Sequence, residues 1–572
     1  MIRHIEHRLA SCHAIARITH NTLPELNQSA AAPDPHCATV SRATFLHNRA
    51  HGGSRTLNPT QGHAQEALAR CMRFSRGLHA AFTPFPRGEQ QDCTSSTTGA
   101  SITAAIHDEP LMTTANPLFR PDLLAKYNAN GPRYTSYPTA LQFRDDFDPG
   151  AYLRAAADPG ASALDLSLYF HIPFCDTVCF YCGCNKIATK NRAHARPYLE
   201  RLKREIALQA ACFDTRRPVS QLHLGGGTPT FMSNDELAEL LGTAREHFTF
   251  VPDDEAEYSI EVDPREASPE TIAHLRKLGF NRLSLGVQDF DPLVQKAINR
   301  IQPLDMTASV MQAARHAGFH SIGVDLIYGL PHQTVESFSR TLDTMIELAP
   351  DRLSVFAYAH MPQLFKMQRR MDAATLPSPA MRLAILQCVV ERLTAAGYVY
   401  IGMDHFALPT DELARAQAQR TLHRNFQGYS TRAECDLIGF GASSIGKVGD
   451  VYAQNAKELP AYAAAIDAGQ LAITRGVRLS ADDRLRRDVI TQLMCNLELR
   501  FDEFEAMYGI HFADTFEPEL ERLRGFEQDG LVSLSNRKLE VQTAGRMLVR
   551  NIAMVFDRYL GQQTLERFSR TV

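Results

Sequence analysis

Residues 257–287 read EYSIEVDPREASPETIAHLRKLGFNRLSLGV, which predicts a β-strand, a helix and a second β-strand in succession. The two ends, EYSIEV (257–262) and RLSLGV (282–287), are short runs rich in apolar residues and bounded by turn residues, as strands are. Between them the tripeptide SPE (268–270) is typical of a helix start, because serine caps the first turn and proline is tolerated there. Two strands joined by a crossover helix predict parallel pairing.

The same unit recurs along the chain from residue 166 onward. Another helix start has Ser233 as its expected N-cap, with Glu236 three residues later. Six repeats predict an α/β fold with a parallel sheet covered by helices, either a partial β/α barrel or a doubly wound sheet. The other strand-like runs are LSLYF (166–170), QLHL (221–224), SIGVDLIY (321–328) and RLSVFAY (352–358).

Chemically active groups follow the predicted strands at one edge. A cysteine-rich loop follows the first strand, GGGT (225–228) follows the second, and Glu261, Gln288 and Asp325 belong to the next three. In a β/α barrel the carboxyl ends of the strands form the face that carries the active site. Each acid alone would be assigned to a helix cap or a salt bridge, but the agreement of five strands predicts a functional site.

The cysteine-rich loop reads HIPFCDTVCFYCGC (171–184) and contains Cys175, Cys179, Cys182 and Cys184. Three thiolates in one tight loop suit a soft metal or an iron-sulfur cluster. Tetrahedral zinc bound by all four cysteines is the structural alternative, although zinc sites usually pair two short ligand groups across a longer insert. If the first three cysteines hold a 4Fe-4S cluster, one iron lacks a protein ligand and can accept a small molecule.

The composition favours a soluble, multidomain protein. The chain has 572 residues, of which 44% are hydrophobic, and its formal net charge of -4 gives no overall basic field that would attract nucleic acid or an anionic membrane. It contains no run of about 18 apolar residues, the length needed to span a bilayer. The remaining cysteines are scattered, unlike a disulfide framework. We therefore expect a cytoplasmic protein with no nucleic-acid or membrane partner.

Residues 1–111 differ in composition from the rest of the chain. They contain no lysine, ten arginines and ten of the 22 histidines, and they show little periodicity. We expect a low-order N-terminal extension. An organelle-targeting presequence is an alternative, although the eight acids in this stretch argue against it. A third interpretation is that Met112 is the true start, because ordinary composition begins abruptly there.

The cysteine spacing and the glycine-rich strand end make the sequence resemble the radical S-adenosylmethionine (SAM) superfamily. Over about residues 112–572 it is similar to the oxygen-independent coproporphyrinogen III oxidase family. Haem-chaperone-like relatives share the barrel but generally lack a cysteine at the place of Cys184 and lack the segment at 131–140. The resemblance rests on GPRYTSYPTA (131–140), YFHIPFC (169–175), CGCNK (182–186), LGGGTPTF (224–231), IEVDPRE (260–266), LGVQDF (285–290), DLIYGLP (325–331) and HRNFQGY (423–429).

This resemblance implies a partial (β/α)6 radical SAM barrel over residues 166–400. The segment 112–165 would pack on the barrel, and 401–572 would form a mostly helical C-terminal lid domain. Residues 480–560, with the hairpin-like LVSLSNRKLEVQT (531–543) and the final helix TAGRMLVRNIAMVF (543–556), could also describe a winged-helix DNA-binding unit. No long basic stripe accompanies the hairpin, so we favour the lid.

The resemblance also implies a reaction. One 4Fe-4S cluster and two SAM molecules per chain would convert two propionate side chains of coproporphyrinogen III to vinyl groups, giving protoporphyrinogen IX in haem biosynthesis. A 5'-deoxyadenosyl radical made from SAM would abstract hydrogen, and an electron donor such as a flavodoxin or ferredoxin would be needed. We expect a monomer. The alternative is a haem-chaperone-like protein that binds haem without this reaction.

Individual residues carry over from the family's motifs. Cys175, Cys179 and Cys182 would hold the cluster, whereas Cys184 would be functional without being a ligand. Tyr169 would take part in catalysis and in cofactor binding.

The ligand contacts carry over in the same way. Glu261 and Asp325 can accept hydrogen bonds from ribose hydroxyls or an ammonium group, and Arg300 can bind a carboxylate through two hydrogen bonds. Arg133 and Lys186 are candidates for the substrate's carboxylates. The full set expected to contact SAM is Tyr169, Tyr181, Gly226, Gly227, Thr228, Glu261, Gln288, Arg300, Asp325, Ala359 and Ile445.

Overall fold

The structure is a computed structural model that describes residues 116–158, 164–432, 435–562 and 568–571. The expected low-order extension over residues 1–111 lies outside the described residues. In the part of the chain that is described, no helix is both long enough and apolar enough to cross a membrane.

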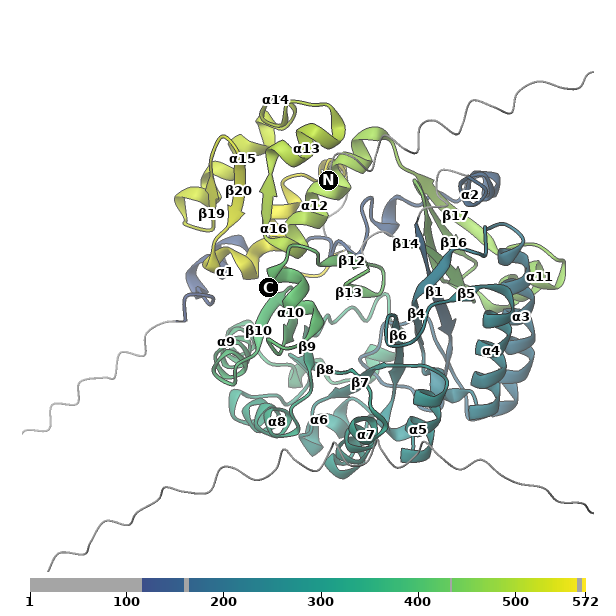
Figure 1. The fold of residues 1–572 in the computed structure, drawn as a ribbon. Helices are drawn as coiled ribbons and strands as arrows, with labels where there is room; N and C mark the ends of the chain where they lie inside the picture. Colours follow the sequence, from purple (N-terminus) through teal and green to yellow (C-terminus); the bar gives the residue numbers. More distant parts are fainter. Residues whose placement is uncertain (1–115, 159–163, 433–434, 563–567, 572) are drawn as a thin grey trace, which may run out of the picture. The chain divides into compact units, whose positions relative to one another are not determined.

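A curved parallel sheet of six strands forms the centre of the fold (Figure 1). The strands pair in chain order, each parallel to the next, which is the arrangement of a partial β/α barrel and confirms the predicted fold class. All six strand-like runs predicted from the sequence lie in this sheet. The strands are β1 (Asp165–Ile172), β4 (Pro218–Gly226), β6 (Glu257–Val262), β7 (Arg282–Gln288), β8 (Ser321–Tyr328) and β9 (Arg352–Ala357).

Helices cover the outer face of this sheet (Figure 1). Ser233 caps α4 with the expected capping box to Glu236, and the Ser268 side chain caps α5. The covering helices are α3 (Ala195–Ala210), α4 (Asn234–His247), α5 (Pro269–Lys277), α7 (Leu304–Ala317), α8 (Val335–Leu348) and α9 (Pro379–Ala395).

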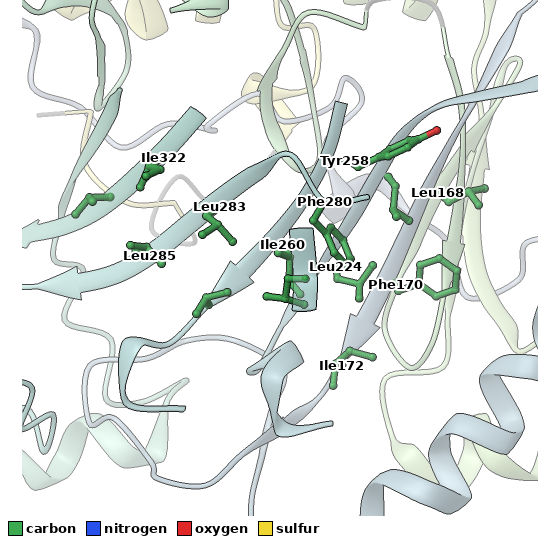
Figure 2. Packing of buried hydrophobic residues seen from close by; sticks show 14 of the residues in the cluster. Leu168, Phe170, Ile172, Leu224, Tyr258, Ile260, Phe280, Leu283, Leu285 and Ile322 are labelled. Atoms are coloured by element: carbon green, nitrogen blue, oxygen red, sulfur yellow. The ribbon is translucent and has the colours of Figure 1, made fainter. Parts of the chain in front are cut away.

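The main core lies between the strands and these helices. Figure 2 shows Leu168, Leu224, Ile260 and Leu285 from four neighbouring strands packed side by side, and all four are fully buried. Residues alternate between the two faces of a strand, so the side chains between these apolar ones point to the inside of the curve. This alternation leaves the inner face free for polar groups.

Further strands extend the sheet at both ends, and the sequence did not predict them. At the β1 end, β14 (Cys435–Phe440) adds in parallel and is followed by β15 (Ile445–Val448), β16 (Val451–Asn455) and β17 (Ile473–Arg478), all antiparallel. At the β9 end, β11 (His405–Ala407) and β10 (Val399–Gly402) add as antiparallel strands.

A hairpin of β12 (His423–Asn425) and β13 (Gly428–Ser430) lies on the inner side of the sheet, between its two ends (Figure 1). The Gln221 side-chain amide of β4 donates to the Ser430 hydroxyl at 2.7 Å, and the Tyr429 ring packs edge-on against His405 of β11. The hairpin therefore connects the two sides of the open barrel.

The C-terminal part is mainly helical from α12 (Ala481–Asn496) onward, as predicted, whereas residues 401–478 of the expected helical domain mainly form the strands described above. It contains the expected hairpin, β19 (Val532–Leu534) and β20 (Lys538–Val541), and the final helix is split into a 3-10 turn (Thr543–Leu548) and α16 (Val549–Met554). The other elements are β18 (Glu498–Arg500), α13 (Phe501–Tyr508), α14 (Phe512–Thr515) and α15 (Glu517–Gln528).

Shorter elements complete the described chain. They are α1 (Pro121–Tyr127), α2 (Pro149–Ala156), β2 (Phe174–Cys175), β3 (Ile187–Ala188), β5 (Thr249–Phe250), α6 (Pro292–Ala297), α10 (Glu412–Ala418) and α11 (Leu459–Asp467).

Candidate functional site

The cysteine-rich loop leaves the carboxyl end of β1 and returns through the short β2–β3 pair. The Ile187 amide donates to the Pro173 carbonyl at 2.7 Å, and the Thr189 amide donates to the Cys175 carbonyl at 2.9 Å. Within the loop, Cys175 and Cys179 are buried and Cys182 is half-buried, whereas Cys184 is exposed. Cys184 is therefore the most exposed of the four cysteine residues.

The glycine-rich end of β4 lies directly against this loop. The Gly227 amide donates to the Ile172 carbonyl at 2.8 Å, and the Thr228 amide donates to the Phe174 carbonyl at the same distance. A Cβ atom at Gly227 would lie 2.6 Å from the Phe174 carbonyl oxygen. The absence of a side chain at this glycine is therefore what allows the two segments to approach so closely.

Two guanidinium groups approach the sulfur of Cys179. Arg265 Nη2 and Arg300 Nη1 each donate to the Cys179 Sγ at 3.5 Å. The Asp263 carboxylate orients both, accepting from Arg265 at 2.7 Å and from Arg300 at 2.9 Å. Both arginine side chains are largely buried, so their charges act on this sulfur with little screening by solvent.

The acids of β6 and β8 lie on the inner side of the sheet. Glu261 accepts from the Gly226 amide at 3.0 Å and lies 3.4 Å from His223 Nε2. Burial would raise the pKa of Glu261, but these hydrogen bonds and the adjacent imidazole hold it below its ordinary value. Burial, together with the nearby Glu261 charge, raises the pKa of Asp325 to about 6. Glu261 is therefore ionised at neutral pH, whereas Asp325 titrates closer to neutral pH.

A cavity of about 370 Å³ brings most of the predicted site residues together. Those that line it are Cys175, Cys179, Tyr181, Cys182, Cys184, Gly226, Gly227, Thr228, Glu261, Gln288, Arg300 and Asp325, with Lys186 beside them. This space, the cysteine cavity, lies next to a polar cavity of about 230 Å³ inside the barrel, and the two share Glu261, Ser284, Asp325 and Phe356 in their walls.

Three predicted residues lie outside the lining of the cysteine cavity. The Tyr169 ring stacks on His223 at 5.8 Å, and its hydroxyl lies 3.1 Å from His171 Nδ1. Ala359 lines a neighbouring cavity after β9. Ile445 begins β15 and packs with a separate apolar cluster.

The sequence did not single out several residues that line the cysteine cavity. Asp263 and Arg265 follow Glu261 at the same strand end, and this position was the available signal. Ser284 of β7, which donates to Asp325 at 3.4 Å, and Phe356 of β9 lie on the inner faces of their strands, where residue alternation could have indicated them.

The arrangement fits an iron-sulfur cluster. Three soft sulfur donors come from one loop, thiolates are the ligands that hold such clusters, and two arginines contribute positive charge beside one of the sulfurs. The buried Arg300 Nε has no hydrogen-bond partner within the described residues, and an anionic ligand in the cavity would supply one.

Comparison with known proteins identifies one family. Residues 169–345 match the Radical SAM superfamily, and residues 479–548 match the HemN C-terminal domain. The oxygen-independent coproporphyrinogen III oxidase of Pseudomonas aeruginosa is 52% identical over 454 residues, which cover 79% of this chain and 98% of the relative. Its counterpart from Salmonella typhimurium is 50% identical over 451 residues, with the same shares covered.

A solved structure leads to the same family. The coproporphyrinogen III oxidase of Escherichia coli, described as a radical SAM enzyme, matches with a TM-score of 0.74 and 48% sequence identity, covering 78% of this chain and 100% of that one. The chain is therefore a radical SAM oxidoreductase and belongs to the oxygen-independent coproporphyrinogen III oxidase family.

Proposed function

We propose that the protein carries out the oxidative decarboxylation of two propionate side chains of coproporphyrinogen III, giving protoporphyrinogen IX in anaerobic haem biosynthesis. The observation that carries the proposal is one cavity in which the thiols of Cys175, Cys179 and Cys182 meet the glycine-rich end of β4 and the carboxylate of Glu261. Family membership supports the choice of substrate.

In this proposal Cys175, Cys179 and Cys182 ligate a 4Fe-4S cluster, and two SAM molecules bind beside it. The bound cluster and SAM supply the radical chemistry that removes hydrogen from a propionate. The protein's own contribution is to bind and orient the reacting groups and to keep water and oxygen out.

The polar residues of the cysteine cavity are suited to a zwitterionic nucleoside ligand. The ionised Glu261 can accept from an ammonium group or from ribose hydroxyls, and the Arg300 Nε can donate its unused hydrogen to a carboxylate. Asp263 already accepts from Arg300, so it fixes the guanidinium plane before the ligand arrives. Such preorganisation lowers the entropic cost of binding.

The remaining assignments belong to the same proposal. Cys184 is exposed at the rim of the cavity, beside the cluster ligands, and acts there without ligating the cluster. Tyr169 supports the site from β1 through His171 and His223. A flavodoxin or ferredoxin donates the electron, and the enzyme works as a cytoplasmic monomer.

Anaerobic reconstitution with iron and sulfide tests this function. The wild-type protein should bind iron, release 5'-deoxyadenosine from SAM under reduction, and form vinyl groups from coproporphyrinogen III. A Cys179→Ser variant should lose all three, whereas Cys212→Ser, whose thiol bonds the Leu208 carbonyl at the end of α3, should retain them. Haem binding without vinyl formation by the reconstituted wild type would instead support a chaperone-like role.

A further inference from the structure

A second cavity of about 410 Å³ opens at the carboxyl ends of β8 and β9. Its walls come from the N-terminal segment, both strand ends, the turn between β10 and β11, the start of α9 and the C-terminal part. We call it the arginine cavity. Residues that define its chemistry are Arg133, Tyr328, His360, Arg382, Asp404 and Arg550.

The arginine cavity and the cysteine cavity meet at one aromatic ring. Phe356 lines the cysteine cavity, and the guanidinium carbon of Arg133 lies 5.6 Å from the centre of that ring. The next residue of β9, Ala357, lines the arginine cavity. A single side chain thus separates the cationic wall of one cavity from the predicted reaction site in the other.

Positive charge prevails in the arginine cavity. Asp404 is the one acid among its lining residues in the described part of the chain, and it is paired with Arg133. Arg550 is buried and donates to the backbone carbonyls of Pro132, Gly131 and Ser569, so its charge is held in place by neutral acceptors. Cations held together in a concave, partly desolvated space attract anions strongly.

Besides Arg550, two guanidinium groups in this wall form no ion pair within the described residues: the exposed Arg570, and Arg382, which lies against the end of β8. Within the same part of the chain, the one hydrogen bond of Arg382 goes from Nη2 to the Tyr358 carbonyl at 3.1 Å. Gly329 faces it with a φ of 86°, and a Cβ at that position would lie 3.0 Å from Arg382 Nε. The glycine therefore leaves space for the arginine to lie along the end of β8.

We propose that the arginine cavity binds propionate carboxylates of the tetrapyrrole substrate, with Arg382 as the principal ligand and Arg133 as a second. Coproporphyrinogen III carries four carboxylates, and two of them do not react. If these two carboxylates bind in the arginine cavity, a reacting propionate can lie on the side of Phe356 that faces the cysteine cavity. The inference rests on the proposed function and adds the residues that recognise the substrate. The methionyl carboxylate of SAM has the same chemistry, so the test must separate the two.

The test uses the full-length, reconstituted enzyme with Arg382→Ala and the charge-retaining Arg382→Lys. Arg340→Ala on α8, whose side chain is 68% exposed, is the matched control. The measurements are KM for coproporphyrinogen III, KM for SAM, and the formation of 5'-deoxyadenosine without tetrapyrrole. Binding of the stable oxidised porphyrin, coproporphyrin III, and of its tetramethyl ester is followed by fluorescence.

Loss of a charge-assisted, bidentate contact should raise KM for coproporphyrinogen III by about 10- to 100-fold in Arg382→Ala, with partial recovery in Arg382→Lys. KM for SAM and 5'-deoxyadenosine formation should stay at the wild-type level, and the ester should bind equally weakly to wild type and Arg382→Ala. An unchanged KM for the tetrapyrrole, or a raised KM for SAM instead, would overturn the inference.

The two proposals fail in different ways. If the wild type forms no vinyl groups, the proposed function is wrong. The binding of coproporphyrin III still tests whether the arginine cavity binds carboxylates. Equal affinity of wild type and Arg382→Ala for coproporphyrin III would then exclude the cavity as a carboxylate site. If Arg382→Ala forms vinyl groups with an unaltered KM for coproporphyrinogen III, the proposed function stands. Only the proposed role of the arginine cavity in binding carboxylates is then wrong.

Discussion

Gly227 shows how a single missing side chain determines the geometry of the site. A methyl group there would lie within 2.6 to 2.9 Å of the backbone of residues 172–174, which cannot move without shifting the cysteine loop. We therefore expect Gly227→Ala to reduce iron content and 5'-deoxyadenosine formation strongly and to destabilise the protein by about 1–3 kcal/mol.

Gly242 is the matched control for this substitution. It lies inside α4, and apart from its chain neighbours and the backbone of its own helix a methyl group added there would meet no atom of the described chain within 4 Å. Gly242→Ala should therefore be neutral or stabilise by roughly 0.5–1 kcal/mol through higher helix propensity. Iron content and thermal unfolding of the two variants check the pair. Similar losses in both would show that the contacts of Gly227 do not matter.

Glu205 of α3 should make stability depend on pH. Its side chain is fully buried, and burial raises its pKa from 4.5 to about 7, against hydrogen bonds from Tyr462, the Gly441 amide and Asn455 that lower it. The folded protein therefore retains a proton that the unfolded chain loses above pH 4.5. The stabilisation of the folded state by this retained proton is fully present at lower pH. It falls by roughly 3 kcal/mol as pH rises to about 7.

A Glu205→Gln variant removes this titration. Between about pH 5 and pH 8 the midpoint of thermal unfolding should fall further in the wild type than in Glu205→Gln, measured in the same buffers. Parallel curves for the two proteins would mean that Glu205 stays ionised in the folded state.

Most single residues of the site could be predicted from the sequence, because strand ends of a β/α barrel converge in space. Glu261 and Gln288 could be selected by their position at a strand end, whereas Asp325 lies inside β8. Asp263 and Arg265 could not be selected, because their importance comes from the Cys179 sulfur, which is distant in sequence and close only after folding. The apolar Ala359 and Ile445 carry no such chemical signal, and they lie outside the lining of the cysteine cavity.

Between secondary-structure elements, a buried ion pair links Arg217, the residue before β4, to Asp436 of β14. Arg217 Nη2 lies 2.7 Å from the Asp436 carboxylate, and the two side chains are 3% and 0% exposed. Removing the cation leaves a buried carboxylate without its partner, so Arg217→Met should destabilise the protein by about 3–5 kcal/mol. The midpoint of thermal unfolding, measured on the reconstituted enzyme, checks this.

The neighbouring Arg216 provides a control with the same chemistry at the surface. It pairs with Asp214, but its side chain is 89% exposed, so solvent and salt screen the interaction. Arg216→Met should leave the unfolding midpoint unchanged. If Arg217→Met were equally silent, the ion pair would add nothing measurable to the pairing of β14 with β1.

The six barrel strands were predictable because each is a short run rich in apolar residues, and helices alternate with these runs along the chain. The strands from β14 to β17 were not, because β14, β15 and β16 follow one another without an intervening helix and so do not continue the strand–helix repeat. Glycines at 439, 446 and 476 weaken the strand signal further. These glycines are required by contacts that only the folded chain reveals. A Cβ at Gly476, for example, would lie 2.4 Å from the Tyr452 carbonyl oxygen of the adjacent strand.

Across the molecule, segments far apart in sequence close around the catalytic face. The Tyr134 hydroxyl donates to Asp557 at 3.0 Å, and Arg550 binds the carbonyls of the segment that contains Arg133. The N-terminal segment and the C-terminal part thus share a set of hydrogen bonds beside the arginine cavity. The motif at 131–140 therefore has a structural role in this contact.

These contacts predict where the chain can be shortened. A protein beginning at Met112 keeps every described strand, the Tyr134–Asp557 bond and both cavities, and 79% of this chain is enough to match 98% of the Pseudomonas relative. We expect it to bind the same amount of iron as the full chain and to show the same kcat/KM for coproporphyrinogen III.

A protein beginning at residue 145 lacks Arg133 and Tyr134, so it should lose stability and tetrapyrrole turnover. Loss of turnover in the Met112 protein at normal iron content would instead assign a catalytic role to residues 1–111.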